Sequence, residues 1–138
     1  MIAYLDSSVL LRLVLGQPGR LKEWRRVETG VASALVEVEC LTTLDRLRFR
    51  AGITDDTLVE RREVAYTLLA EAEVVEPTHA VLRRASQPFP TPLGTLDAIH
   101  LATALMWSEL TQTEIVMATH DLTLAAAARA SGLRVVGS

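Results

Sequence analysis

The feature that most constrains this chain is the alternation of short apolar runs with longer segments of helical character. Apolar runs of this length, bounded by turn residues, are typical of buried strands. Helices between them predict right-handed crossovers and a parallel sheet covered on both faces. We therefore predict an α/β fold, a three-layer α/β/α sandwich with a parallel sheet of about five strands. The predicted strands are residues 2–5, 30–32, 74–75, 115–118 and 134–136.

Helix-start and helix-stop residues divide the rest of the chain. Ser33 and Thr95 are predicted N-caps, and Gly52 and Gly132 follow predicted helix ends. Three prolines between residues 86 and 94 predict a stiff loop. The predicted helices are residues 9–15, 21–27, 34–50, 55–72, 80–85, 96–108 and 122–130.

Length and cysteine content bound the class of protein. A chain of 138 residues fits one domain, residues 1–138, and chains near this size bury about 68–70% of their unfolded surface. The single cysteine, Cys40, excludes an intramolecular disulfide and a CxxC metal site, and fits a reducing cytoplasm as a buried small hydrophobe. No basic leader precedes the first apolar run, and no stretch approaches the roughly 18 apolar residues of a membrane helix. We expect a soluble, cytoplasmic protein with no membrane contact.

The charge balance argues at first sight against a nucleic-acid partner. Fourteen basic residues face seventeen acidic ones, for a net charge of −3. The basic set is thirteen arginines and Lys22, which lies in no phosphate-loop motif. A mean hydropathy of +0.25 is high for a small charged domain and indicates apolar surface left for a protein partner.

Four acidic residues lie where an α/β sheet places its ligands. Asp6 and Asp121 follow predicted strands, and Asp97 lies in the first turn of a predicted helix. Each of these alone is explained by helix capping or by the helix dipole. The fourth, Glu39, lies in a helix that is apolar on nearly every side, but Glu37 has similar surroundings, and periodicity does not choose between them.

Taken together, the acids predict a cation. Neighbouring carboxylates raise one another's pKa unless positive charge compensates, and neither a lysine nor a sequence-adjacent arginine is available. Mg²⁺ prefers a few carboxylates, keeps several waters and completes its shell with substrate phosphate. The pattern therefore indicates metal-assisted phosphoryl-transfer or hydrolytic chemistry.

Four segments, in order along the whole chain, resemble a PIN domain, and most closely the VapC-type toxins of bacterial toxin–antitoxin pairs. They are YLDSSVLLRL, SALVEVECLTTL, TLDAIHLATAL and THDLTLAAAA before the terminal strand. The resemblance implies an endoribonuclease dependent on Mg²⁺ or Mn²⁺, with a cognate antitoxin and a homodimer as partners. It places the family's acidic quartet on Asp6, Glu39, Asp97 and Asp121, and so favours Glu39 over Glu37.

The resemblance also implies the roles of these residues. Asp6 and Asp97 are the chief metal ligands, while Glu39 and Asp121 complete the shell and orient or deprotonate the attacking water. Ser7 and Thr119 occupy the small hydroxyl positions beside the first and last acids. In-line attack on RNA leaves a 5′-phosphate and a 3′-hydroxyl.

RNA contact is expected through arginine side chains, which bind phosphate bidentately. The candidates are Arg12, Arg46, Arg48 and Arg50, although a solvated helix face explains them at least as well. When the four proposed metal ligands are left out of the count, thirteen acidic and fourteen basic residues remain. The net charge therefore no longer argues against an RNA partner.

The three histidines of the chain have structural explanations. His100 is expected in a packing or hydrogen-bonded role, His120 in a solvent-facing turn and His79 on the surface.

A phospho-accepting or non-catalytic signalling module of the receiver type also carries acids at strand ends. It needs a second acid after the first strand and a lysine near the last, and neither is present.

Overall fold

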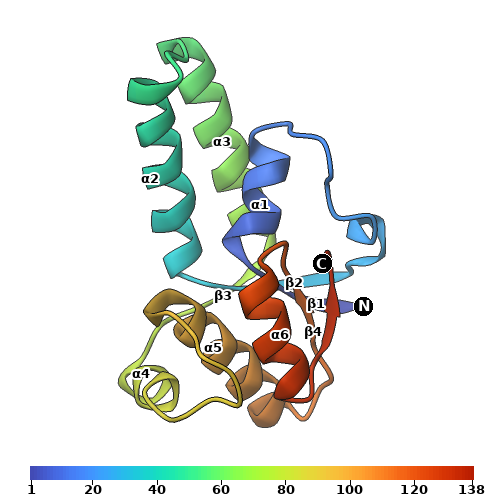
Figure 1. The fold of residues 1–138 in the computed structure, drawn as a ribbon. Helices are drawn as coiled ribbons and strands as arrows, with labels where there is room; N and C mark the ends of the chain where they lie inside the picture. The colour runs from blue at the N-terminus through green and yellow to red at the C-terminus, as the bar shows by residue number, and fades with distance from the viewer.

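The computed structural model describes residues 1–138 and contains one parallel sheet of five strands in the order β3-β2-β1-β4-β5 (Figure 1). Adjacent strands are parallel throughout, with Ala3 opposite Gly30 on one side and Val116 on the other. The predicted fold class is confirmed. The strands are β1 (Ile2–Leu5), β2 (Thr29–Ser33), β3 (Glu73–Val75), β4 (Val116–Ala118) and β5 (Arg134–Val136).

Helices cover both faces of the sheet, as Figure 1 shows, with α1 to α3 on one side and α4 to α6 on the other. None of them is long and apolar enough to cross a membrane. The helices are α1 (Ser7–Val14), α2 (Leu35–Arg50), α3 (Asp55–Glu71), α4 (His79–Ala85), α5 (Thr95–Thr111) and α6 (Leu122–Ala130).

Side chains on the two faces of β1 pack into two separate hydrophobic cores. Ala3 and Leu5 pack under α1 and α2, whereas Tyr4 points to the opposite face, toward α5 and α6. This alternation follows from the two-residue repeat of a strand, and both faces are apolar because both are covered. Leu101 of α5 and Leu124 of α6 are fully buried there, each contributing roughly 1.5–3 kcal/mol.

The helix predicted at residues 21–27 is wrong in extent. The structure has only a single 3₁₀ turn there, η1 (Trp24–Arg26). Leu21 is buried and Trp24 packs against the same core, so one turn already brings the apolar side chains inward. A longer helix would have to meet the cost of helix nucleation without further apolar contacts.

The cap expected at Thr95 is also wrong, because Gly94 occupies the N-cap position and Thr95 is the first helical residue. Ser33 does accept a hydrogen bond at the start of α2, from the Leu35 N–H at 3.2 Å. The proline-rich segment 86–94 contains no helix or strand, as predicted, and its Phe89 packs against the core under α5.

The strand order locates the place where a ligand fits best. Connections from β1 run toward β2 and β3, whereas β4 and β5 lie on the other side of β1. The order therefore reverses between β1 and β4, and in open parallel sheets the crevice at the carboxyl ends of such strands is the usual ligand site.

Candidate active site

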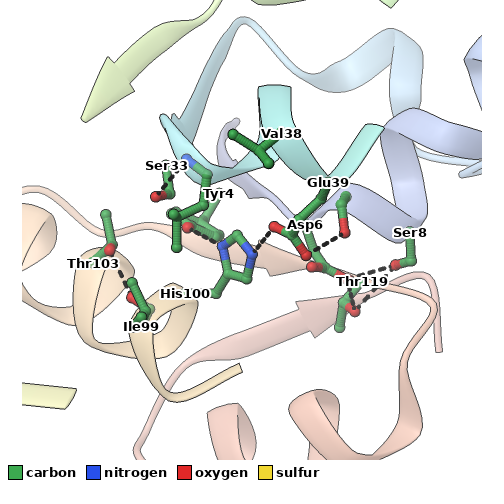
Figure 2. Close-up of polar contacts among 12 residues, drawn as sticks. Tyr4, Asp6, Ser8, Ser33, Val38, Glu39, Ile99, His100, Thr103 and Thr119 are labelled. Atoms are coloured by element: carbon green, nitrogen blue, oxygen red, sulfur yellow. Dashed lines mark hydrogen bonds and ion pairs between the residues drawn. The ribbon is translucent and has the colours of Figure 1, made fainter. Parts of the chain in front are cut away.

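Asp6 lies at the carboxyl end of β1, where its backbone N–H extends the pairing with β4 by donating to the Ala118 carbonyl at 3.1 Å. The residue is only 4% exposed. It occupies the N-cap position of α1, yet its carboxylate accepts no hydrogen bond from a backbone N–H of the helix. Instead its Oδ2 accepts from the Ser8 hydroxyl at 2.6 Å and from the Thr119 hydroxyl at 2.8 Å (Figure 2). The capping explanation therefore fails for Asp6, and its carboxylate faces β4.

The turn after β4 brings the second carboxylate to the same edge. Thr119 is fully buried, and its Oγ1 accepts from the Asp121 N–H at 3.0 Å while donating to Asp6. Asp121 itself is exposed and caps α6, with its Oδ1 accepting from the Leu124 N–H at 2.9 Å. Asp121 is thus a true helix cap, and its other carboxylate oxygen is not used by the cap.

Glu39 lies on α2, and its side chain differs from that of Glu37 in direction and exposure. Two residues of a helix differ by about 200° in direction, so only one of the two faces the sheet edge. Glu37 is exposed, whereas the Glu39 side chain is 20% exposed. The Glu39 Oε2 accepts from the Ser7 hydroxyl at 3.2 Å, so the Ser7 side chain contacts Glu39 rather than Asp6.

His100 of α5 holds the other oxygen of Glu39. Its Nε2 lies 2.5 Å from the Glu39 Oε1, and its Nδ1 lies 2.6 Å from the Tyr4 hydroxyl (Figure 2). Burial lowers the pKa of His100, but the hydrogen bond to Glu39 and the negative charges of Glu39 and Asp6 outweigh burial and raise it. The expected hydrogen-bonded role of His100 is confirmed. Its position one turn after Asp97 was the only signal of this role in the sequence.

Asp97 lies half-buried in the first turn of α5, and the charges of the other acids shift its pKa. Burial, followed by the charges of Asp121 and Asp6, raises the pKa of the Asp97 carboxyl to about 6. His100 lowers this pKa and Glu39 raises it further. The charges of the other three predicted acids therefore all act on Asp97 at one edge of the sheet, although the four acids come from four different parts of the chain.

The donor set fits a hard divalent cation. In this structure, no three histidine, cysteine, aspartate or glutamate side chains lie in an arrangement that could hold a metal ion. Mg²⁺ needs only one or two carboxylates, because waters and substrate phosphate fill the remaining positions. Asp6 and Asp97 are suitable carboxylates: Ser8 and Thr119 orient the first, and neighbouring negative charge disfavours ionisation of the second unless a cation is present.

The predicted RNA-contacting arginines fall in two places. Arg12 lies on α1 and donates to the Gly19 carbonyl at 2.8 Å. The other three lie at the distal end of α2, about 10–16 Å along the helix from Glu39. There Arg48 pairs with Asp45 at 3.3 Å and stacks on Phe49 at 4.5 Å. The structure does not bring Arg46, Arg48 and Arg50 to the acidic edge.

The remaining histidines differ from each other. His79 is exposed, as expected. His120 was expected to face solvent, and this is wrong, because it is half-buried with its Nδ1 2.7 Å from the Gly137 carbonyl. The end of β5 packs over the turn after β4, a contact between residues seventeen positions apart that no local pattern announces.

The thiol of Cys40, 1% exposed beneath the site, is expected to resist alkylation in the native protein. Burial, together with the charges of Glu39 and Asp6, raises the pKa of Cys40 to about 12, so little thiolate forms at neutral pH. A coloured disulfide reagent should titrate no thiol before denaturation and one thiol per chain in guanidinium chloride. Rapid labelling of the folded protein at pH 8 would contradict this prediction.

Fold and site together define an α/β domain with a cluster of carboxylates at the switch point of a parallel sheet. Residues 3–130 match the model of the PIN domain, and the chain belongs to this family. PIN domains are generally nucleases. The chain also resembles a solved structure described as a toxin–antitoxin complex from Klebsiella pneumoniae, with a TM-score of 0.62 and 17% sequence identity, covering 97% of this chain and 95% of that one. No curated protein matches the sequence.

Proposed function

We propose that residues 1–138 form one Mg²⁺-dependent endoribonuclease domain that acts as the toxin of a VapC-type toxin–antitoxin pair. The observation that carries this proposal is the burial of Asp97 among the charges of Asp121, Asp6 and Glu39, which raise its pKa, at the switch point of a PIN domain. A cluster of this kind favours a divalent cation and, with it, a phosphate substrate.

In this proposal Asp6 and Asp97 hold the metal, and Mn²⁺ substitutes for Mg²⁺. The bound ion lowers the pKa of a coordinated water and offsets the charge on the reacting phosphate. Ser8 and Thr119 hold one oxygen of Asp6, which leaves Oδ1 for the ion. The carboxylate therefore keeps one orientation when the ion binds.

The other two carboxylates serve the attacking water. Both oxygens of Glu39 are held, one by His100 and the other by Ser7, so this side chain is fixed in direction and orients the water. Asp121 uses Oδ1 as a helix cap and is exposed, so its Oδ2 is the oxygen placed to accept a proton from the water. Hydrolysis then leaves a 5′-phosphate and a 3′-hydroxyl.

The proposed protein partners are a cognate antitoxin and a second copy of the chain. Three exposed apolar side chains each lie next to one of the acids in sequence, namely Val38, Leu96 and Leu122, exposed by 59%, 48% and 76%. An antitoxin segment packed on these side chains would obstruct the carboxylates. The match to a structure described as a toxin–antitoxin complex supports this partner. We further propose that the protein acts in the cytoplasm.

The test is cleavage of a defined single-stranded RNA by the purified chain. We expect cleavage with Mg²⁺ or Mn²⁺, arrest by EDTA, recovery when Mg²⁺ is restored in excess, and new ends that carry a 5′-phosphate. A receiver-type module would instead take up a phosphoryl group from a low-molecular-weight phosphodonor. A stable acyl-phosphate on an aspartate, together with intact RNA, would refute the proposed nuclease.

A further inference from the structure

A second feature lies beside the acidic edge and is basic. It is an open cavity of about 360 Å³ between the segment that joins α1 to η1 and the end of β5, which lie close together in Figure 1. Arg12, Arg20 and Lys22 line it, together with one carboxylate, Glu23. None of the three cations forms an ion pair with a carboxylate. Unpaired positive charge gathered in a cavity attracts an anion.

Two glycines give the cavity a defined wall. Gly19 has φ +77, and its carbonyl accepts a hydrogen bond from the Arg12 guanidinium. A Cβ on Gly19 would lie 2.7 Å from the Arg12 Nη1. Gly137 has φ +95, and a Cβ there would lie 2.7 Å from the Thr119 carbonyl oxygen. Both backbone angles lie in the region that favours glycine, and at Gly137 a side chain would also collide with the Thr119 backbone. A Cβ on Gly137 would lie 3.1 Å from the Leu21 Cδ1, so the end of β5 packs against the segment that joins α1 to η1.

His120 connects the cavity to the carboxylates. Its backbone N–H donates to the Ser8 Oγ at 2.9 Å, and Ser8 in turn donates to Asp6. In the ring, Nδ1–H donates to the Gly137 carbonyl at 2.7 Å. The other ring nitrogen, Nε2, is buried and has no hydrogen-bond partner. A buried polar atom without a partner is unfavourable, and this atom lies beneath the surface of the cavity that His120 lines.

We propose that this cavity binds a backbone phosphate of single-stranded RNA, at a nucleotide flanking the bond that is cleaved. The inference rests on the proposed nuclease function. Guanidinium and ammonium groups are the usual partners of phosphate. The unpaired cations require an anionic ligand, and the RNA that the proposed nuclease cleaves carries a phosphate at every nucleotide, including those next to the acidic edge. In this proposal Arg20 and Lys22 bind RNA next to the acidic edge, together with Arg12, which the sequence already suggested.

The test measures binding without cleavage. A short fluorescein-labelled single-stranded RNA is titrated in EDTA with the wild-type protein and with the double variant Arg20→Ala/Lys22→Ala, using fluorescence anisotropy at several salt concentrations. We expect the double variant to bind about tenfold more weakly. Its salt slope should fall in magnitude by about 0.7, because the slope contributed by a single-strand contact is about 0.7 for each phosphate and the cavity holds one phosphate. In Mg²⁺, KM should rise by the same factor as Kd.

The matched control is Arg134→Ala, an exposed arginine on β5 that faces only Glu114, at 3.7 Å. Its affinity and salt slope should equal those of the wild type. Both side chains of the double variant are exposed, and unchanged circular dichroism and Tm verify its fold.

The outcomes separate this inference from the proposed function. Equal affinities and slopes for wild type and double variant, with normal Mg²⁺-dependent cleavage, overturn the phosphate site and leave the nuclease intact. Absence of cleavage by the wild type refutes the nuclease instead. If the double variant loses binding to polyglutamate but not to RNA, the cavity serves an acidic protein segment and the inference is wrong.

Discussion

Asp6→Asn is expected to lower Mg²⁺-dependent RNA cleavage by at least about 100-fold. The amide keeps the size of the carboxylate and an oxygen that accepts from Ser8 and Thr119, so the fold is preserved. It removes the buried negative charge on which the proposed metal binding depends. Because the Asp6 charge raises the pKa of Asp97, the variant should also lower that pKa, and its metal-free form should be at least as stable as the wild type.

The measurement combines single-turnover cleavage with thermal unfolding, with and without Mg²⁺. The wild type should gain Tm on adding Mg²⁺, and the variant should gain much less. Asp45→Asn is the control, since Asp45 is an exposed residue of α2 whose ion-pair partner is Arg48, and it should leave cleavage unchanged. Undiminished cleavage by Asp6→Asn would remove Asp6 from the proposed role.

His100→Ala is expected to reduce cleavage by about 10–100-fold, the usual effect of losing a residue that orients a metal-site carboxylate. The change removes the donor to Glu39 and leaves the buried Tyr4 hydroxyl without its partner. It should also lower the free energy of unfolding by about 1–3 kcal/mol, because polar groups lose their hydrogen bonds inside the protein. Urea unfolding measures the second effect independently of the first.

Two further substitutions at this position distinguish positioning from packing. Glutamine places an amide N–H near the site of the imidazole Nε2 and can still donate to Glu39, whereas asparagine places its amide near Nδ1 and keeps only the contact with Tyr4. We expect His100→Gln to retain more activity than His100→Asn at comparable stability. Equal activities would show that His100 acts through packing alone. His79→Ala, at an exposed histidine within hydrogen-bond distance only of Arg83, is the matched control.

The predictions from local sequence were wrong in two places, the segment between α1 and β2 and the turn after β4. Leu21, Trp24 and Val27 have helical spacing, yet only one 3₁₀ turn forms, because the segment needs to anchor only a few side chains. His120 was placed in solvent because turn residues usually are exposed. The packing of Gly137 over the turn reverses this expectation, and it depends on the close approach of two backbones.

The sequence alone determined the order and type of the main elements, the parallel sheet, and the presence of acids at strand and helix ends. It could do so because apolar periodicity and capping residues act over a few positions, and because parallel strands align their carboxyl ends. Tertiary structure decided the rest. The pairing of β1 with β4 brings Thr119 to Asp6 across 113 positions, and the direction of one helix face selects Glu39 over Glu37. Contacts of this length have no local signal, since they exist only after the sheet has assembled and the helices have packed on its faces.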